Sequence, residues 1–265
     1  MAHPILFSLI ASGALAGFAA WRRALTPGGL ALAGALALVI CYCGGWAGYL
    51  ALVATFCFTV AAGKISGARR ERVEQALHAK TGRRDAAQIF CNVFVGALML
   101  LLWRVTRWRG FLWAYGGAMA AALADSMASE LGVLSKRPPR DILTLKPVTP
   151  GLSGGVTALG LGMSVLGAAM IAALYALPGD GPGFPAFLDV AAAGVFGALC
   201  DSALGSGVQV KYRCPVCSAL TEKPVHCAVP GVPERGLRFM TNDAVNLCNN
   251  LLGAAAAAAL YAIHS

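Results

Sequence analysis

The sequence predicts an all-α polytopic integral membrane protein with about eight transmembrane helices in one bundle. Three observations predict this class: a hydrophobic fraction of 58%, a charged fraction of only 12%, and a mean hydropathy of +0.68 over 265 residues. A soluble domain usually carries about twice that charged fraction. A large soluble protein with buried helices would also need polar helix faces, which the long apolar runs lack.

Eight segments are apolar enough to serve as spans, because a helix of about 20 apolar residues crosses the hydrocarbon core of a bilayer. The segments are 4–21, 28–43, 46–63, 88–105, 109–127, 154–177, 186–205 and 242–263. The second and third come from one long apolar run, which the Gly44-Gly45 pair divides. The first is followed, rather than preceded, by basic residues, which favours a retained helix over a cleaved signal peptide.

Basic residues are concentrated in alternate loops. The loops after spans one, three, five and seven hold 18 of the 21 Lys and Arg residues. The positive-inside rule therefore predicts that these loops are cytoplasmic and that both termini lie outside. We expect the membrane to be the inner membrane of a bacterium. The net charge of +9 thus reflects topology and membrane lipids rather than a nucleic-acid partner. We expect one membrane domain, 1–265, with a basic cytoplasmic loop at 64–87 and a Cys-containing cytoplasmic loop at 211–240.

Carboxylates occur where a membrane segment should not tolerate them. The segments "ALADS" and "ALCDS" place Asp125 and Asp201 in two apolar stretches, and Glu130 and Asp243 lie close to span ends on the same predicted side. Ionisable residues in spans are costly and mark functional sites. Clustered carboxylates and carboxamides are the ligands that Mg²⁺ takes together with substrate phosphates, so we expect a Mg²⁺ site here, with Asp125, Asp201 and Asp243 as ligands.

Further polar side chains recur at helical spacing beside these carboxylates. They are Ser126, Ser129, Ser202, Ser206, Gln209, Asn242, Asn246, Asn249, Gln88 and Asn92. The alternative interpretation is that such residues only hydrogen-bond between helices, as Ser, Asn and Gln often do in membranes.

A Gly-rich turn follows the fifth span. The loop contains four prolines, which exclude a continuous helix, and ends in Lys146, Thr149, Gly151, Ser153, Gly154 and Gly155 before the sixth span. Free backbone N–H groups before a helix, with a basic residue nearby, form an anion site. A plain connector is the alternative, and the sequence contains neither of the standard Gly-rich nucleotide-binding motifs.

Three cysteines stand apart from the six that lie singly in apolar spans. The segment "CPVCSALTEKPVHC" contains Cys214, Cys217, His226 and Cys227, a composition typical of a structural zinc site. A redox pair and unliganded loop thiols are the alternatives.

Five ordered segments resemble a known family. "KISGARRERVEQ", "DSMASELGVLS", "TLKPVTPGLSGGVTALG", "GALCDSALGSGVQ" and "FMTNDAVNLCNNLLGA" are similar to blocks of the transmembrane protein 19 family, also called domain of unknown function 92. The resemblance runs from about Lys64 to Gly253. Because that family includes a plant phytyl-phosphate kinase, the resemblance implies an isoprenoid-lipid phosphate kinase that uses a nucleoside triphosphate, with cytidine triphosphate as the expected donor.

The leading hypothesis is therefore phosphoryl transfer at the cytoplasmic membrane face. We expect Asp125 and Asp201, assisted by Glu130 or Asp243, to hold Mg²⁺. The triphosphate would lie against Lys146 and the Gly-rich turn, and Asn242 and Asn246 would orient phosphate oxygens or nucleotide. The lipid phosphate would bind Lys64, Arg69 and Arg70. A secondary transporter built from inverted repeats and a hydrogen-bonded membrane scaffold are the two rival hypotheses.

Overall fold

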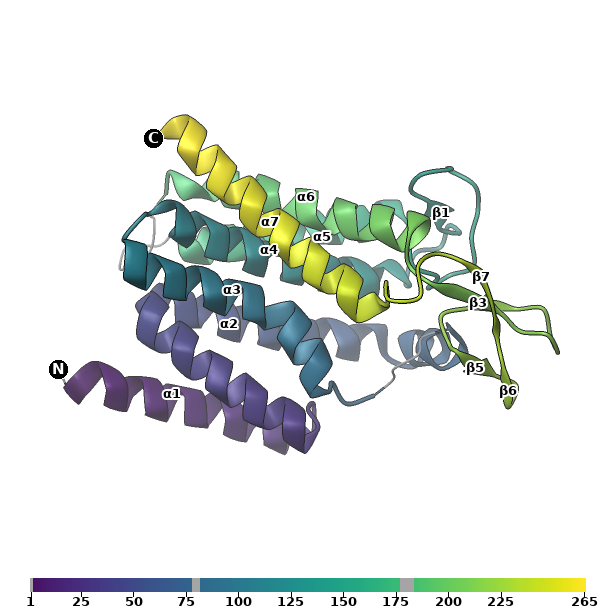
Figure 1. The fold of residues 1–265 in the computed structure, drawn as a ribbon, viewed down its shortest axis with the longest axis horizontal. Helices are drawn as coiled ribbons and strands as arrows, with labels where there is room; N and C mark the ends of the chain where they lie inside the picture. Colours follow the sequence, from purple (N-terminus) through teal and green to yellow (C-terminus); the bar gives the residue numbers. More distant parts are fainter. Residues whose placement is uncertain (1, 78–81, 177–183) are drawn as a thin grey trace.

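The computed structural model describes residues 2–77, 82–176 and 184–265 as a helical bundle with small β-sheets at one end (Figure 1). The helices are α1 (Ala2–Trp21), α2 (Pro27–Leu77), α3 (Ala86–Thr106), α4 (Gly110–Gly132), α5 (Ala158–Tyr175), α6 (Ala186–Gly207) and α7 (Asn242–His264). The described residues are thus mainly helical, as predicted.

Helix α2 reverses direction at the predicted glycine pair. Gly45 has non-helical dihedral angles (φ 59°, ψ −152°), and the two parts of α2 run antiparallel in Figure 1. A Cβ built on Gly48 would lie 3.5 Å from the carbonyl oxygen of Ile40, although eight residues of straight helix span about 12 Å. The apolar run therefore forms two segments, as the sequence indicated.

Helix α4 lies at the centre of the bundle and contacts α2, α3, α5, α6 and α7. Its residues from Leu112 to Ala124 are all buried. Glycines allow the neighbours to approach: a Cβ on Gly117 would lie 2.3 Å from the carbonyl oxygen of Gly253 in α7, and one on Gly194 in α6 would lie 2.6 Å from the Ala120 Cβ. Small residues at helix contacts are typical of membrane bundles.

The basic loops gather at one end of the bundle. Residues 22–26, 82–85, 133–157 and 208–241 lie at the end that carries the strands, and the two ends of the chain lie at the other end (Figure 1). Hydrogen bonds from Thr26 N to Arg84 O and from Arg84 N to Ala24 O join two of these connections. This arrangement agrees with the predicted segregation of charge, while the side of the membrane that this end faces stays a prediction.

Five helices in the described part of the chain are long and apolar enough to cross a membrane, namely α2, α3, α5, α6 and α7. Helix α1 contains a shorter apolar helix, Ile5–Trp21. The chain is therefore a membrane protein in which the exact number of eight spans stays a prediction.

Two expected boundaries change, and a third cannot be compared with the described residues. The 64–87 region is not simply a loop, because α2 continues to Leu77 beyond a second break at Gly67 (φ 48°, ψ −136°), and residues 78–81 lie outside the described residues. The sixth span begins as a helix only at Ala158, since positive φ angles at Gly151 and Gly154 prevent helix across the turn. Its predicted end, 177, also lies outside the described residues.

The loops carry short antiparallel strands that the sequence did not predict. They are β1 (Arg140–Asp141), β2 (Gly155–Val156), β3 (Lys211–Arg213), β4 (Leu220–Thr221), β5 (Val225–His226), β6 (Val229–Pro230) and β7 (Val232–Arg235). Strand β1 pairs with β2, β5 pairs with β6, and β3 lies between β4 and β7. The 211–240 loop is therefore a small β module that packs on the bundle end.

Candidate functional site

A polar cavity of about 1110 Å³ opens at the loop end of the bundle. Its lining comes from the second half of α2, from each of the helices α3 to α7, and from the Gly-rich turn. Most of the predicted site residues line it: Arg69, Arg70, Gln88, Asn92, Asp125, Ser126, Ser129, Glu130, Gly151, Ser153, Gly154, Gly155, Asp201, Ser202, Asn242, Asp243 and Asn246. Motifs that lie up to 177 positions apart in sequence thus meet in one site.

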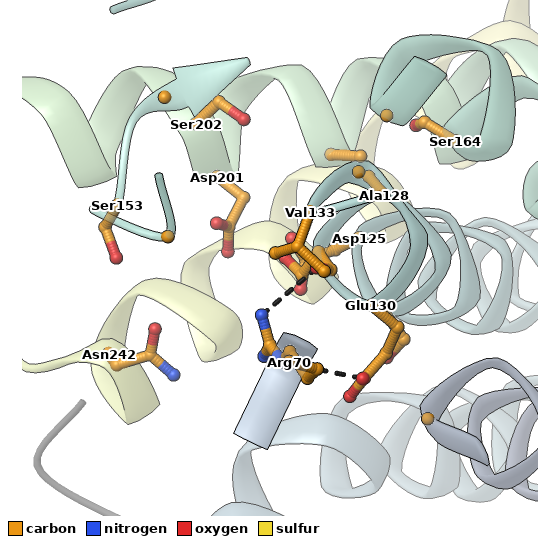
Figure 2. Close-up of a pocket in the computed structure, with 18 of the residues that line it drawn as sticks. Arg70, Asp125, Ala128, Glu130, Val133, Ser153, Ser164, Asp201, Ser202 and Asn242 are labelled. Carbon is orange, nitrogen blue, oxygen red and sulfur yellow. Dashed lines mark hydrogen bonds and ion pairs between the residues drawn. The ribbon is translucent and has the colours of Figure 1, made fainter. Parts of the chain in front are cut away.

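The two Asp-Ser pairs face the same space from neighbouring helices. Asp125 comes from α4 and Asp201 from α6, and Figure 2 shows both carboxyl groups directed into the cavity. The two carboxylates are close enough to repel one another, and Glu222 adds a third negative charge beside Asp201. Because α4 and α6 run in the same direction in Figure 1, the repeated motif is a parallel one.

The two carboxylates differ in their partners. The cationic groups of Arg70 and Arg84 act on Asp125, and Ser129 hydrogen-bonds to it. By contrast, Oδ2 of Asp201 is buried and has no hydrogen-bond partner among the described residues. A buried, unpaired carboxylate oxygen is costly, so this atom is suited to a cation or donor that a ligand supplies.

The side chain of Arg70, from α2, contacts two residues near the end of α4. Its Nε lies 3.5 Å from Oε2 of Glu130, and its Nη1 donates to the carbonyl of Ser129 (3.1 Å). The hydroxyl of Ser66 also lies 3.4 Å from Oε2 of Glu130. Glu130 therefore positions Arg70, rather than standing free in the cavity.

The Gly-rich turn packs directly against the end of α6. Gly154 has a φ of 91°, and a Cβ placed on it would lie 2.5 Å from the Cα of Ser206. Asp141, from β1, accepts hydrogen bonds from the Ser206 hydroxyl (2.6 Å) and from the Thr144 and Leu143 N–H groups. Burial acts to raise the pKa of the Asp141 carboxyl, but these hydrogen bonds outweigh it and hold the pKa below its ordinary value.

Ser153 is held on both sides by the β module. Its carbonyl accepts a hydrogen bond from Lys211 Nζ (2.6 Å), and its N–H donates to Oε1 of Glu222 (3.0 Å). Lys211 is completely buried, with 0% of its surface exposed. Burial, assisted by the nearby Arg235, lowers the pKa of Lys211 to about 8 against the opposing effects of Glu222 and Asp141.

Four predicted residues do not line the cavity. Lys64, Lys146 and Thr149 are exposed, and Gln209 is buried behind the end of α6. The expectation that Lys146 lies in the site is not met, because its carbonyl pairs with the N–H of Asp141 while its side chain is exposed to solvent. Leu145, with a φ of 58°, turns the chain at this point.

Several cavity residues were not predicted. The lining contains five basic side chains, of which three were not predicted: Arg84, Lys136 and Arg137. It also contains six acidic side chains, of which two were not predicted: Glu71 and Glu222. Lys136-Arg137, in front of two prolines in a motif loop, was a usable signal. No sequence signal marked Glu222, which lies in the β module.

The alternative of purely structural hydrogen bonds holds for some of the polar residues. Asn249 Nδ2 lies 3.4 Å from the Ala121 carbonyl, and Asn250 Nδ2 donates to the Cys91 carbonyl (2.8 Å). Asp85 and Gln88 form a capping box at the start of α3, so Gln88 has a structural role as well as a place in the cavity.

A small apolar pocket of about 70 Å³ adjoins the polar cavity among α1, α2, α3 and α4. The two share Phe56, Thr59, Arg84, Asn92 and Ser126 in their linings. A polar site is therefore continuous with an apolar surface between helices.

The Cys and His residues of the β module also come together. One ligand atom from each of Cys214, Cys217, His226 and Cys227 lies within 4.8 Å of all the others. Among the described residues, this is the only group of three or more His, Cys, Asp or Glu side chains with such spacing. The cavity carboxylates are thus not a closed metal cage.

The fold and the site define the class: a polytopic membrane protein with a polar, carboxylate-containing cavity at one end of its helix bundle. The sequence matches the family described as "Integral membrane protein DUF92" over residues 10–254, so the chain belongs to that family.

Relatives of similar length support this assignment. Protein PGR of Arabidopsis thaliana is 27% identical over 94% of this chain and 93% of its own length. The "Uncharacterized membrane protein sll0875" of Synechocystis is 27% identical over 97% of this chain and 91% of its own. The "Uncharacterized membrane protein MJ0933" of Methanocaldococcus jannaschii is 38% identical over 43% of this chain and 49% of its own. No solved structure matches the chain.

Proposed function

We propose that the protein is a membrane kinase that transfers the terminal phosphoryl group of a nucleoside triphosphate, with cytidine triphosphate as the first candidate, to an isoprenoid lipid phosphate. One observation carries the proposal: a single cavity joins the paired carboxylates of Asp125 and Asp201 to basic side chains, a Gly-rich turn and an adjoining apolar pocket. Phosphoryl transfer needs chiefly positioning and neutralisation of charge, which such a cavity supplies.

The phosphates of the nucleotide would lie against the Gly-rich turn. Lys136 and Arg137 line the cavity on this side, and we assign them the role that Lys146 was expected to fill. Helices α3, α5 and α7 all begin at this end of the bundle, so their positive dipole ends favour bound anions. Asn242 and Asn246, in the first turns of α7, would orient phosphate oxygens or the nucleotide.

The acidic residues of the cavity call for a cation with the phosphates. Six carboxylates against five basic side chains would repel a free triphosphate. Mg²⁺ is usually held by one or two carboxylates and substrate phosphates, and the unpaired oxygen of Asp201, beside Asp125, fits that donor set. Bound there, the ion would neutralise the charge of the phosphates; Asp243, also in the lining, stays a candidate assistant ligand.

The lipid substrate would enter between the helices. Arg70 and Arg69 line the polar cavity, and Arg84 lies where that cavity meets the apolar pocket. A lipid phosphate at these guanidinium groups could extend its chain along Phe56. This geometry favours an acceptor with a charged head and an apolar tail.

The reaction needs no general base. An oxygen of the lipid phosphate, already anionic near neutral pH, forms a bond to the terminal phosphorus of the nucleotide. The bond from that phosphorus to the bridging oxygen breaks, and the nucleoside diphosphate leaves with its electron pair. The absence of His from the cavity lining described by the structure is compatible with this step.

The test is direct transfer with purified protein in lipid nanodiscs. Radiolabelled nucleoside triphosphates and Mg²⁺ are offered with phytyl, farnesyl, geranylgeranyl or longer polyprenyl phosphates, and lipid diphosphate is measured. We expect labelled lipid with at least one acceptor. If no lipid accepts the label, and an anionic substrate crosses liposomes without nucleotide, the kinase hypothesis is wrong and the transporter hypothesis is favoured.

A further inference from the structure

The β module carries four ligand side chains on two turns. Cys214 directly follows β3, and Cys217 lies in the turn that leads to β4. His226 ends β5, and Cys227 begins the turn toward β6. Two antiparallel pairs of strands therefore present their turns to one point.

Three of the six distances between ligand atoms match the edges of a tetrahedral zinc site, and all six are within 4.8 Å. Sγ of Cys217 lies 3.7 Å from Sγ of Cys227, and His226 Nδ1 lies 3.5 Å and 3.3 Å from these two sulfurs. Zinc bonds of about 2.3 Å to sulfur and 2.0–2.1 Å to nitrogen give tetrahedral edges of about 3.8 and 3.5 Å. A disulfide would require sulfurs about 2.05 Å apart.

The chain conformation explains how adjacent residues serve one site. Cys227 and Ala228 both have left-handed backbone conformations, with φ angles of 52° and 60°. The chain therefore reverses immediately after His226, and the Cys227 thiol returns to the same side as the imidazole. This turn allows two adjacent residues to contribute ligand atoms to one site.

The module has little apolar core of its own. Its strands have two to four residues each, and Val216, Val225 and Val232 are mostly exposed rather than packed in a core. Small units without a core usually depend on disulfides or a metal. All nine cysteines of the chain are free thiols here.

We propose that Cys214, Cys217, His226 and Cys227 bind one structural Zn²⁺, and that this ion holds the β3–β4 hairpin that clamps the Gly-rich turn at Ser153. Four protein ligands leave no open position, which is typical of structural rather than catalytic zinc. The metal site itself does not depend on the proposed kinase function.

The hairpin geometry connects the metal to the turn. Strands β3 and β4 pair through Tyr212 and Thr221, so the Cys214–Cys217 turn is the tip of the hairpin and Lys211 lies at its base. Lys211 and Glu222 hold Ser153 from both sides. The Thr221 hydroxyl and the Glu222 N–H both donate to the Leu77 carbonyl at the end of α2. A metal ion that holds the Cys214–Cys217 turn would therefore also keep the base of the hairpin in contact with Ser153 and Leu77.

The metal assignment is tested by elemental analysis of protein purified without chelator. We expect about one zinc per chain in the wild type and in the control Cys57→Ala, whose thiol is half-buried in α2, and near zero in Cys217→Ser/Cys227→Ser. Co²⁺ exchanged into the wild type should show the visible absorption of tetrahedral thiolate coordination. A wild type without metal, a disulfide among these cysteines, or equal zinc in the double variant would overturn the site.

The connection to Ser153 is tested separately by hydrogen exchange of folded wild-type protein before and after zinc removal with a chelator. We expect exchange of the 149–155 amides to rise about tenfold while amides in the middle of α4 stay protected. Zinc removal without any change at 149–155 would disprove the clamp but leave the metal site intact. Neither measurement requires transfer activity, so a failure of the proposed function would not be mistaken for a failure here.

Discussion

Asp125 and Asp201 occupy equivalent places in two similar segments, yet their surroundings differ. Asp125 receives compensation from the protein itself through Arg70, Arg84 and Ser129. Asp201 faces two other acids and keeps one buried oxygen without a partner. The same dipeptide thus yields one carboxylate that is integrated into the fold and one that is left for a ligand, which teaches that sequence repetition does not imply equal roles.

The largest effect is expected for Asp201→Asn. The amide keeps the size of the side chain but removes the charge that we assign to the metal, so transfer to the lipid phosphate should fall about 100- to 1000-fold. The measurement is the rate of lipid diphosphate formation at saturating Mg²⁺.

A matched control lies on the same helix. Asp189, at the opposite end of α6, accepts a hydrogen bond from Trp113 and pairs with His264, far from the cavity. Asp189→Asn should keep most of the activity while lowering the unfolding temperature. Equal activity in Asp201→Asn and wild type would remove Asp201 from the site.

Asp125→Asn should have a smaller effect, about ten- to hundredfold, because Arg84 and Ser129 remain to order the site. The same transfer assay measures it. Wild-type transfer rates in both Asp125→Asn and Asp201→Asn would contradict the metal assignment as a whole.

The different partners of Asp125 and Asp201 can be compared by double-mutant cycles on the free energy of unfolding. Arg70→Gln and Asp125→Asn should couple by about 1 kcal/mol, because each removes the partner of the other. Arg70→Gln and Asp201→Asn should be nearly additive. Equal coupling in the two cycles would show that Arg70 compensates both carboxylates to the same extent, which would contradict the difference between Asp125 and Asp201.

The last prediction concerns stability rather than transfer, at the contact between β1 and the end of α6. Asp141→Asn should lower the free energy of unfolding by about 1–3 kcal/mol at pH 7, because it weakens the bonds from Ser206, Thr144 and Leu143. The pKa of Asp141 is lowered in the folded protein, so its contribution is present above the ordinary carboxyl pKa and is lost as the pH falls through the folded value. Thermal unfolding from pH 7 to pH 3 should therefore show the two proteins converging below about pH 4. A difference that is constant with pH would contradict the role of the carboxylate.

Much of the architecture was predictable from the sequence. Hydropathy located the helices, the Gly44-Gly45 pair marked the reversal of α2, and the distribution of Lys and Arg grouped the loops that now lie at one end. Because the acidic motifs all lay near that end, the meeting of Asp125, Asp201 and Asn242 in one cavity followed from topology.

Other features depended on contacts that no local pattern encodes. Glu222 and Lys211 reach Ser153 across 69 and 58 positions of sequence, and strands of two to four residues are too short to give an alternating pattern. The expected position of Lys146 in the site was wrong. The backbone is left-handed at Leu145, and the Lys146 side chain that follows is exposed to solvent. Leu rarely adopts this conformation, so the sequence did not indicate a turn here.

The burial of α4 has a consequence for biosynthesis. This helix is rich in Ala and Gly, carries Asp125, and is less apolar than the five helices named above as candidate spans. It owes its place to the five helices that surround it rather than to lipid. Its neighbours α5, α6 and α7 are synthesised after it, so α4 can reach its final environment only once the C-terminal part of the chain has been made. Truncation before α7 should therefore leave α4 open to quality-control proteases, even though every residue of α4 is present.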